Sequence, residues 1–246
     1  MVPRSTFLLG RGLLDSPRPR AWSGVVAAFM LAASSLAGEE AAPGTRGLRT
    51  DRLSRKHLQA WNRIVEIVMA DDRDGRPLHP ALRQLWDAVD TSGHVVYVEI
   101  SDRTPSTNAG RFVITNVDPE GKAHEAILVM NLRAIDTAST KPGAARASGF
   151  IPFKGLGKNA RYAELLGHEL AHAVWHFADP ERARLAQRLK SESERWMQMM
   201  LAARVRGPEL QEQGEELARL KRELEKPAEA AEVVIWEELQ RGRRTP

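Results

Sequence analysis

The sequence predicts an α+β fold, in which a small β-meander lies next to a helix that carries an HExxH motif. An antiparallel helical hairpin follows at the C-terminal end. Three observations support this prediction. β-Branched residues gather between positions 94 and 132, helical periodicity fills the segments on both sides, and Gly207-Pro208 divides the long C-terminal helical region. Residues 51–246 are expected to form a single domain that includes the hairpin, 180–241.

Composition sets limits on the chemistry of this chain. Its 246 residues are 42% hydrophobic and 28% charged, which is typical of a globular protein and excludes collagen-like and wholly disordered classes. The chain has no cysteine, so disulfides, thiolate metal sites and cysteine nucleophiles are excluded. The net charge of +4 could indicate a polyanionic partner, so the position of the excess charge along the chain matters.

Most of the excess positive charge lies in residues 1–37, where four arginines face one aspartate. An apolar stretch from Ala21 to Ala37 follows them and ends in small residues, which predicts a cleaved signal peptide. An uncleaved membrane anchor is the alternative. The remaining chain would carry about +1 and begin with a flexible stretch, 38–50. We therefore expect export to the periplasm or the medium, no nucleic-acid partner, and no stable membrane insertion after cleavage.

The sequence predicts two helices and three strands in the first part of the domain. Apolar residues at helical spacing indicate a helix that ends near Ala70, and Pro80 begins a shorter one that Gly93 closes. The strands are expected at 94–100, 111–117 and 126–132, the last two joined by a turn at 118–121. Residues 134–158 lack periodicity, and a loop of that length can border a cleft.

The rest of the chain is predicted to be helical. One helix covers residues 159–177, and Asp179-Pro180 begins a second that runs to Arg206. A third begins near Glu209 and continues to about Arg241, with a restart or kink at Pro227. Leucines and Trp196 on facing sides indicate that these last helices pair as the hairpin.

The motif HELAH occupies residues 168–172. On a helix, His168 and His172 are four residues apart, so both imidazoles project from one face and can hold one cation. Glu169 would lie beside the open coordination position, where it can take a proton from a metal-activated water. The alternative is a helix with two ordinary histidines. Zn2+ suits two neutral imidazoles, a carboxylate and a water.

On these residues the chain resembles the zincin metallopeptidases. The resemblance implies a zincin-like fold, zinc, a peptide or protein substrate, and a strand beside the motif helix that holds an extended substrate, here 126–132. The metzincin pattern fails, since Trp175 and Ala178 stand where its glycine and third histidine would be. A deformylase-type site needs a cysteine, so a glutamate on a later helix, as in gluzincins, remains.

Glutamates near the C-terminus are the candidates for the third ligand. A turn at Gly207 would return Glu229 and Glu232 to the end of the motif helix. Pro227 before Glu229 resembles the start of the ligand helix in some gluzincins, so Glu229 ranks first, with Glu232 as ligand or as the acid behind a ligand. Less favoured candidates are Glu225, Glu237 and Glu238.

Together these observations predict an exported zinc metallopeptidase, a hydrolase with Glu169 as its general base. An envelope binding or scaffold protein is the alternative. It would act through the helical hairpin, with a structural or degenerate metal site. His176 and Tyr162 are weaker candidates for supporting roles near the motif, and both can also be ordinary packed residues.

Overall fold

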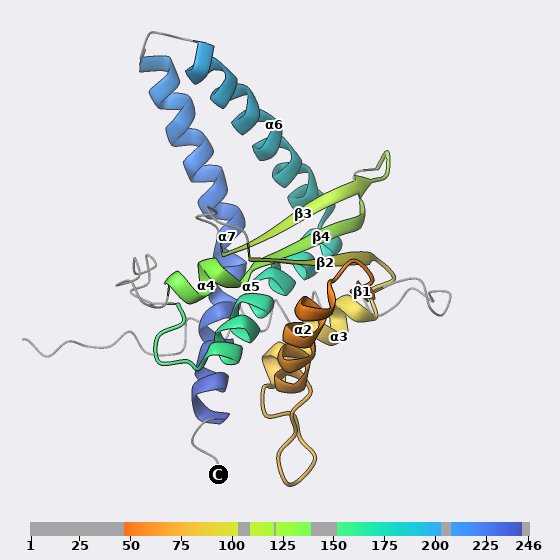
Figure 1. The fold of residues 1–246 in the computed structure, drawn as a ribbon. Coiled ribbons are helices and arrows are strands. Elements are labelled where there is room, and N and C mark those ends of the chain that lie inside the picture. The colour runs from red at the N-terminus through yellow and green to blue at the C-terminus, as the bar shows by residue number, and fades with distance from the viewer. Residues whose placement is uncertain (1–46, 103–108, 121, 139–151, 203–207, 243–246) are drawn as a thin grey trace, which may run out of the picture.

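The computed structural model describes residues 47–102, 109–120, 122–138, 152–202 and 208–242. Within them the chain forms a strand, two helices, three strands and four helices (Figure 1). In order these are β1 (Gly47–Arg49), α2 (Arg55–Val68), α3 (Pro80–Asp90), β2 (Val95–Ser101), β3 (Gly110–Val117), β4 (Ala123–Asn131), α4 (Leu132–Ala138), α5 (Lys158–Ala178), α6 (Pro180–Ala202) and α7 (Pro208–Gly242). The expected signal peptide, 1–37, lies outside the described residues. The stretch expected to be flexible, 38–50, ends in β1.

The strands form one mixed sheet in the order β1-β2-β4-β3, so the expected meander is wrong. The β3–β4 hairpin is antiparallel, as the turn at 118–121 predicts, but β2 pairs with β4 in parallel and does not touch β3. β4 contains an apolar run from Ala126 to Met130, which suits a strand in the middle of the sheet. Ala126, Leu128 and Met130 are fully buried there. β4 is paired on both sides, so it cannot receive an added strand. Among the described strands, the edge of the sheet near α5 is β3.

Helix α5 is the centre of the core. Fourteen of its 21 residues are buried, because α2, α3, α7 and the sheet pack around it. Ser54 caps α2 by accepting a hydrogen bond from the amide of His57, and Trp61 of α2 packs 5.5 Å from Trp86 of α3. The C-terminal part of α7 reaches the start of α3, where Glu238 accepts a hydrogen bond from the amide of Ala81 at 2.9 Å. Both ends of the domain are thereby tied to one core.

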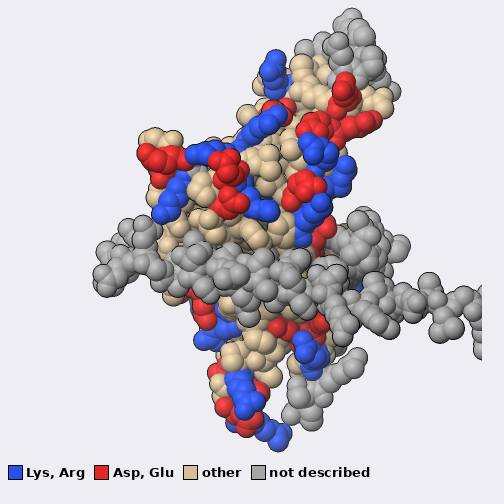
Figure 2. Space-filling model, turned by 180° about the vertical axis from the view of Figure 1, so that it is seen from behind, with Lys and Arg blue, Asp and Glu red and all other residues tan. Residues whose placement is uncertain are grey.

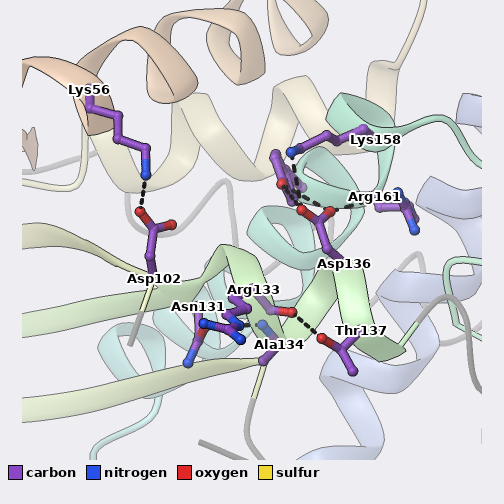
Figure 3. A network of polar contacts seen from close by, with 10 residues as sticks. Lys56, Asp102, Asn131, Arg133, Ala134, Asp136, Thr137, Lys158 and Arg161 are labelled. Atoms are coloured by element: carbon purple, nitrogen blue, oxygen red, sulfur yellow. Dashed lines mark hydrogen bonds and ion pairs between the residues drawn. The ribbon is translucent and has the colours of Figure 1, made fainter. Parts of the chain in front are cut away.

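Polar contacts fix the short helix α4 between β4 and α5 (Figure 3). Asn131, the last residue of β4, caps α4 by accepting a hydrogen bond from the amide of Ala134 at 3.0 Å. Asp136 accepts a hydrogen bond from the hydroxyl of Tyr162 at 3.0 Å and pairs with Lys158 at 3.1 Å. The expected irregular loop, 134–158, therefore begins inside α4, and its residues 139–151 lie outside the described part.

Helices α6 and α7 form the predicted antiparallel hairpin, which projects from the body of the molecule (Figure 1). The indole of Trp196 donates a hydrogen bond to the carbonyl of Leu210 at 3.0 Å and lies against Gly214. α7 continues through Pro227 without ending. Met197 and Met200 are exposed on α6. Both helices diverge toward the body, where α7 passes along α5.

Charged side chains on the hairpin are paired along each helix. The pairs include Arg188 with Glu192, Arg219 with Glu216 and Lys226 with Glu223. Figure 2 shows basic and acidic side chains mixed in the same way over the face that it draws. In the part of the chain that the structure describes, no helix combines the length and the apolar character needed to cross a membrane.

Candidate metal centre

The HELAH motif lies in the middle of α5, as predicted. The rings of His168 and His172 are 5.0 Å apart and both face α7. Gly167 allows this close approach of the two helices, because a Cβ atom there would lie 2.3 Å from Cδ1 of Ile235 on α7. The residue before the first histidine is thus a point of close contact between α7 and the motif helix.

Glu225 is the carboxylate that α7 brings to both histidines. Its Oε2 atom lies 3.4 Å from Nε2 of His168 and 3.4 Å from Nε2 of His172. Within the described residues, these three side chains are the group whose ligand atoms all lie within 4.8 Å of one another. Together they can hold a metal ion.

The donor set and its spacing suit a small divalent cation. Ligand atoms about 2.0–2.2 Å from a tetrahedral ion lie roughly 3.3–3.6 Å from one another. The two observed distances of 3.4 Å fall in this range. Two imidazoles and one carboxylate leave a fourth position open, as at catalytic zinc sites. The residues present therefore fit the ion that the motif predicts.

Glu232, also on α7, lies behind the first histidine. Its Oε2 atom is 3.4 Å from Nδ1 of His168, and its side chain is only 1% exposed. A carboxylate at the far nitrogen of a metal-binding histidine holds the ring in orientation and makes it a stronger ligand. Of the two roles predicted for Glu232, its position behind His168 fits the second one.

Glu229, ranked first by the sequence, does not belong to the group formed by His168, His172 and Glu225. Among the less favoured candidates, Glu237 is exposed and Glu238 accepts a hydrogen bond from Ala81 at the start of α3. Of the five candidates, Glu225 is the one that lies within the group of possible ligand atoms.

The carboxylates of the site favour positive charge on or between the imidazoles. Burial by itself would lower the pKa of His168, but the carboxylates of Glu225 and Glu232 outweigh it and raise that pKa to about 10. Burial would raise the pKa of Glu225, but the two imidazoles hold it far below its usual range. Three carboxylates, including Glu169, lie around two imidazoles in a largely buried space, so positive charge there is favourable, whether it comes from a proton on His168 or from a bound cation.

Glu169 is buried beside this group and holds one unused oxygen. The residue is 3% exposed, and its Oε2 atom has no hydrogen-bond partner among the described residues. Burial raises the pKa of Glu169, and the neighbouring imidazoles partly offset that rise. A buried carboxylate with a free acceptor atom is unusual in a structural role and ordinary in a general base.

A row of stacked rings leads from the metal centre to the sheet edge. His176 stacks on His172 at 6.0 Å and on Phe112 of β3 at 5.8 Å. Burial lowers the pKa of His176 to about 3, which keeps its ring neutral. His176 does not belong to the group formed by His168, His172 and Glu225, and it packs as a wall of the site.

Beyond this wall, a groove of about 260 Å³ separates β3 from α6. Strand residues 111–114 form one side, and His176 lies at the end nearest the metal centre. The opposite side consists of residues from α6, namely Ala186, Gln187, Lys190 and Glu194. The groove thus follows the free edge of the sheet.

Tyr162 has a packing role rather than a catalytic one. Its hydroxyl donates to Asp136, and the residue is 2% exposed, so it is a packed helix tyrosine. The sequence analysis did not single out Gly110 and Phe112. In the structure, Gly110 of β3 lies against Glu169, and Phe112 of β3 stacks on His176. A glycine at the start of a β-branched run was the available signal for the first of these.

Comparison of the chain with models of protein families, with curated proteins and with solved structures finds no match.

Proposed function

We propose that this protein is a zinc-dependent metallopeptidase. One observation carries the proposal: Glu225 Oε2 lies 3.4 Å from Nε2 of both His168 and His172, with the buried, partly unpaired carboxylate of Glu169 next to them. Two imidazoles, one carboxylate and an adjacent general base are the parts that metal-assisted hydrolysis requires. The resemblance of HELAH to zincin peptidases points to the peptide bond as the target.

The residues divide the chemistry between them. Zinc held by His168, His172 and Glu225 would supply a Lewis acid that acidifies water and polarises a carbonyl. Glu169 takes the proton from the attacking water on its free Oε2 atom and later delivers it to the leaving amine. Glu232 keeps His168 oriented through Nδ1. His176 and Phe112 shield one side of the site from solvent.

The free edge of β3 supports an extended peptide as the substrate. An added strand there would use the unpaired backbone groups of β3 and would lie in the groove that α6 closes on the other side. The scissile bond would then pass the metal centre near Gly110, the residue of β3 that touches Glu169. This assignment replaces residues 126–132, because 126–131 belong to the central strand β4.

Hydrolysis of peptides by the purified protein tests the proposal. We expect zinc-dependent cleavage of an unfolded protein such as casein. In Glu169→Gln it should fall by about 10²–10⁴-fold while the bound zinc and the circular dichroism spectrum stay unchanged. Wild-type protein that binds zinc but cleaves no peptide in a broad library would contradict it.

Export belongs to the same proposal. The basic and apolar order of residues 1–37 supports a signal peptide, with cleavage before Gly38. N-terminal sequencing of the protein recovered outside the cytoplasm should begin at Gly38. A chain that begins at Met1 in the membrane fraction would support the anchor instead.

A second candidate is the envelope scaffold. The projecting hairpin and the exposed Met197 and Met200 favour it, since exposed methionines are common at adaptable binding surfaces. Binding of a partner that survives His168→Ala and is lost in Met197→Glu/Met200→Glu would support this candidate. Loss of binding in His168→Ala would argue against it.

A further inference from the structure

The first residue of the edge strand lies directly on the carboxylate of Glu169. A Cβ atom built at Gly110 would be 2.2 Å from Oε1 of Glu169 and 2.8 Å from Cδ1 of Leu165. Any residue other than glycine at this position must displace one of these side chains or the strand. We propose that Gly110 is a positioning residue, whose missing side chain creates the space in which Glu169 is held for catalysis.

Backbone conformation does not explain this glycine. Among the described residues, the glycines in the left-handed region are Gly47, Gly75, Gly93 and Gly155, and Gly110 is not among them. An alanine could adopt the backbone angles of Gly110 without strain. The need for glycine is therefore one of space, at the contact between β3 and α5.

The strand is tied to its neighbour at this position. Gly110 pairs with the fully buried Met130 of β4, and the carbonyl of the preceding Ala109 accepts a hydrogen bond from Asn131 at 2.7 Å. Asn131 in turn caps α4 through its side chain. The strand is thus fixed at the point of contact, so an added methyl group must act on Glu169 or Leu165.

The consequence is specific to the carboxylate. Glu169 is held between α5 and the strand backbone with Oε1 against Gly110 and with Oε2 unpaired. A methyl group at position 110 would push the carboxylate out of this space, and the three atoms nearest to that methyl group belong to Glu169 and Leu165, not to His168, His172 or Glu225. Metal binding and proton transfer should therefore separate in Gly110→Ala. The expected loss of proton transfer rests on the proposed peptidase function, whereas the steric clash between position 110 and Glu169 does not.

The test is a double-mutant cycle on thermal unfolding of the metal-free, full-length protein. We expect Gly110→Ala to lower the melting temperature by roughly 3–8 °C. In the Glu169→Ala background the same change should cost less than half of that, because the carboxylate it strikes is gone. Gly157→Ala is the matched control: Gly157 is the N-cap of α5, so alanine there should cost some stability, but a Cβ atom at Gly157 meets nothing within 4 Å, and the cost should be the same with and without Glu169.

Equal losses in both backgrounds would overturn the proposal. If Gly110→Ala does not fold, folding of Gly110→Ala/Glu169→Ala supports it, and failure of both overturns it. On zinc-loaded protein, Gly110→Ala should retain wild-type zinc content and KM, with kcat reduced at least about 100-fold. An active Gly110→Ala enzyme would refute the positioning role. An inactive wild type would refute the peptidase function and leave the unfolding cycle to decide the steric claim.

Discussion

The Oε2 atom of Glu225 lies 3.4 Å from the Nε2 atom of His172. This contact joins the second histidine of α5 to a carboxylate on α7, at the place where the hairpin meets the body of the domain. It adds a third possible metal ligand to a two-histidine motif. It also makes the metal centre depend on the packing of α7 against α5.

Replacement of Glu225 should abolish tight metal binding. We expect Glu225→Ala to weaken zinc affinity by more than about 100-fold, since it removes one of three protein ligands. Glu229→Ala is the control, because Glu229 lies on the same helix but outside the group of His168, His172 and Glu225. The zinc affinity of this variant should stay within about threefold of wild type. Competition titration with a chromogenic chelator measures both. The reverse pattern would restore Glu229 as the ligand.

Glu232→Gln should have an intermediate effect. The amide keeps the size of the side chain but loses the charge that supports His168 through Nδ1. Zinc affinity should fall by about 10–100-fold, less than for Glu225→Ala. Zinc affinity that is unchanged in the amide variant would show that Glu232 serves only to pack α7.

Gly167→Ala tests the packing that carries the site. The new Cβ would lie 2.3 Å from Cδ1 of Ile235, so the free energy of unfolding should drop by about 1–3 kcal/mol. Ile235→Val removes that methyl group and should recover at least half of the loss in the double variant. Urea unfolding of the metal-free proteins provides the comparison. If the valine recovers nothing, α7 is not held at this contact.

Filling the groove should impair substrate binding without changing the metal centre. Ala186→Trp places a large ring between α6 and β3, and we expect KM to rise by about tenfold or more with the zinc content intact. Ser191→Trp is the control, since Ser191 is exposed on α6 and does not line the groove. Equal KM values for the two variants would remove the groove from the substrate path.

The sequence predicts the helices and strands of this domain better than their arrangement. The boundaries of α2, α3 and α5 follow from apolar spacing, proline and the Asp179-Pro180 pair. Strand order depends on burial instead. The apolar run of β4 marks a central strand and the polar residues of β3, such as Arg111 and Asn116, mark an edge, but local turn signals favour pairing neighbours in sequence.

The site shows the same division. His168, Glu169 and His172 are predictable because one helix fixes their relative positions. Glu225 is not, because its position depends on where α6 turns into α7. A turn centred on Gly207 would place Trp196 opposite position 218 of α7, but Trp196 contacts Leu210 instead. Each residue of α6 therefore faces a residue of α7 that is closer to the start of α7 than predicted. That shift moves the carboxylate opposite the motif toward the start of α7, which is why Glu225 and not Glu229 reaches the histidines.

The most direct test of the metal centre is a crystal structure of the zinc-loaded protein, with diffraction recorded on both sides of the zinc absorption edge. The account predicts one anomalous peak per chain, about 2.0–2.2 Å from Nε2 of His168, Nε2 of His172 and a carboxylate oxygen of Glu225. The absence of a peak between these residues, or a zinc ion held by Glu229 in place of Glu225, would contradict it.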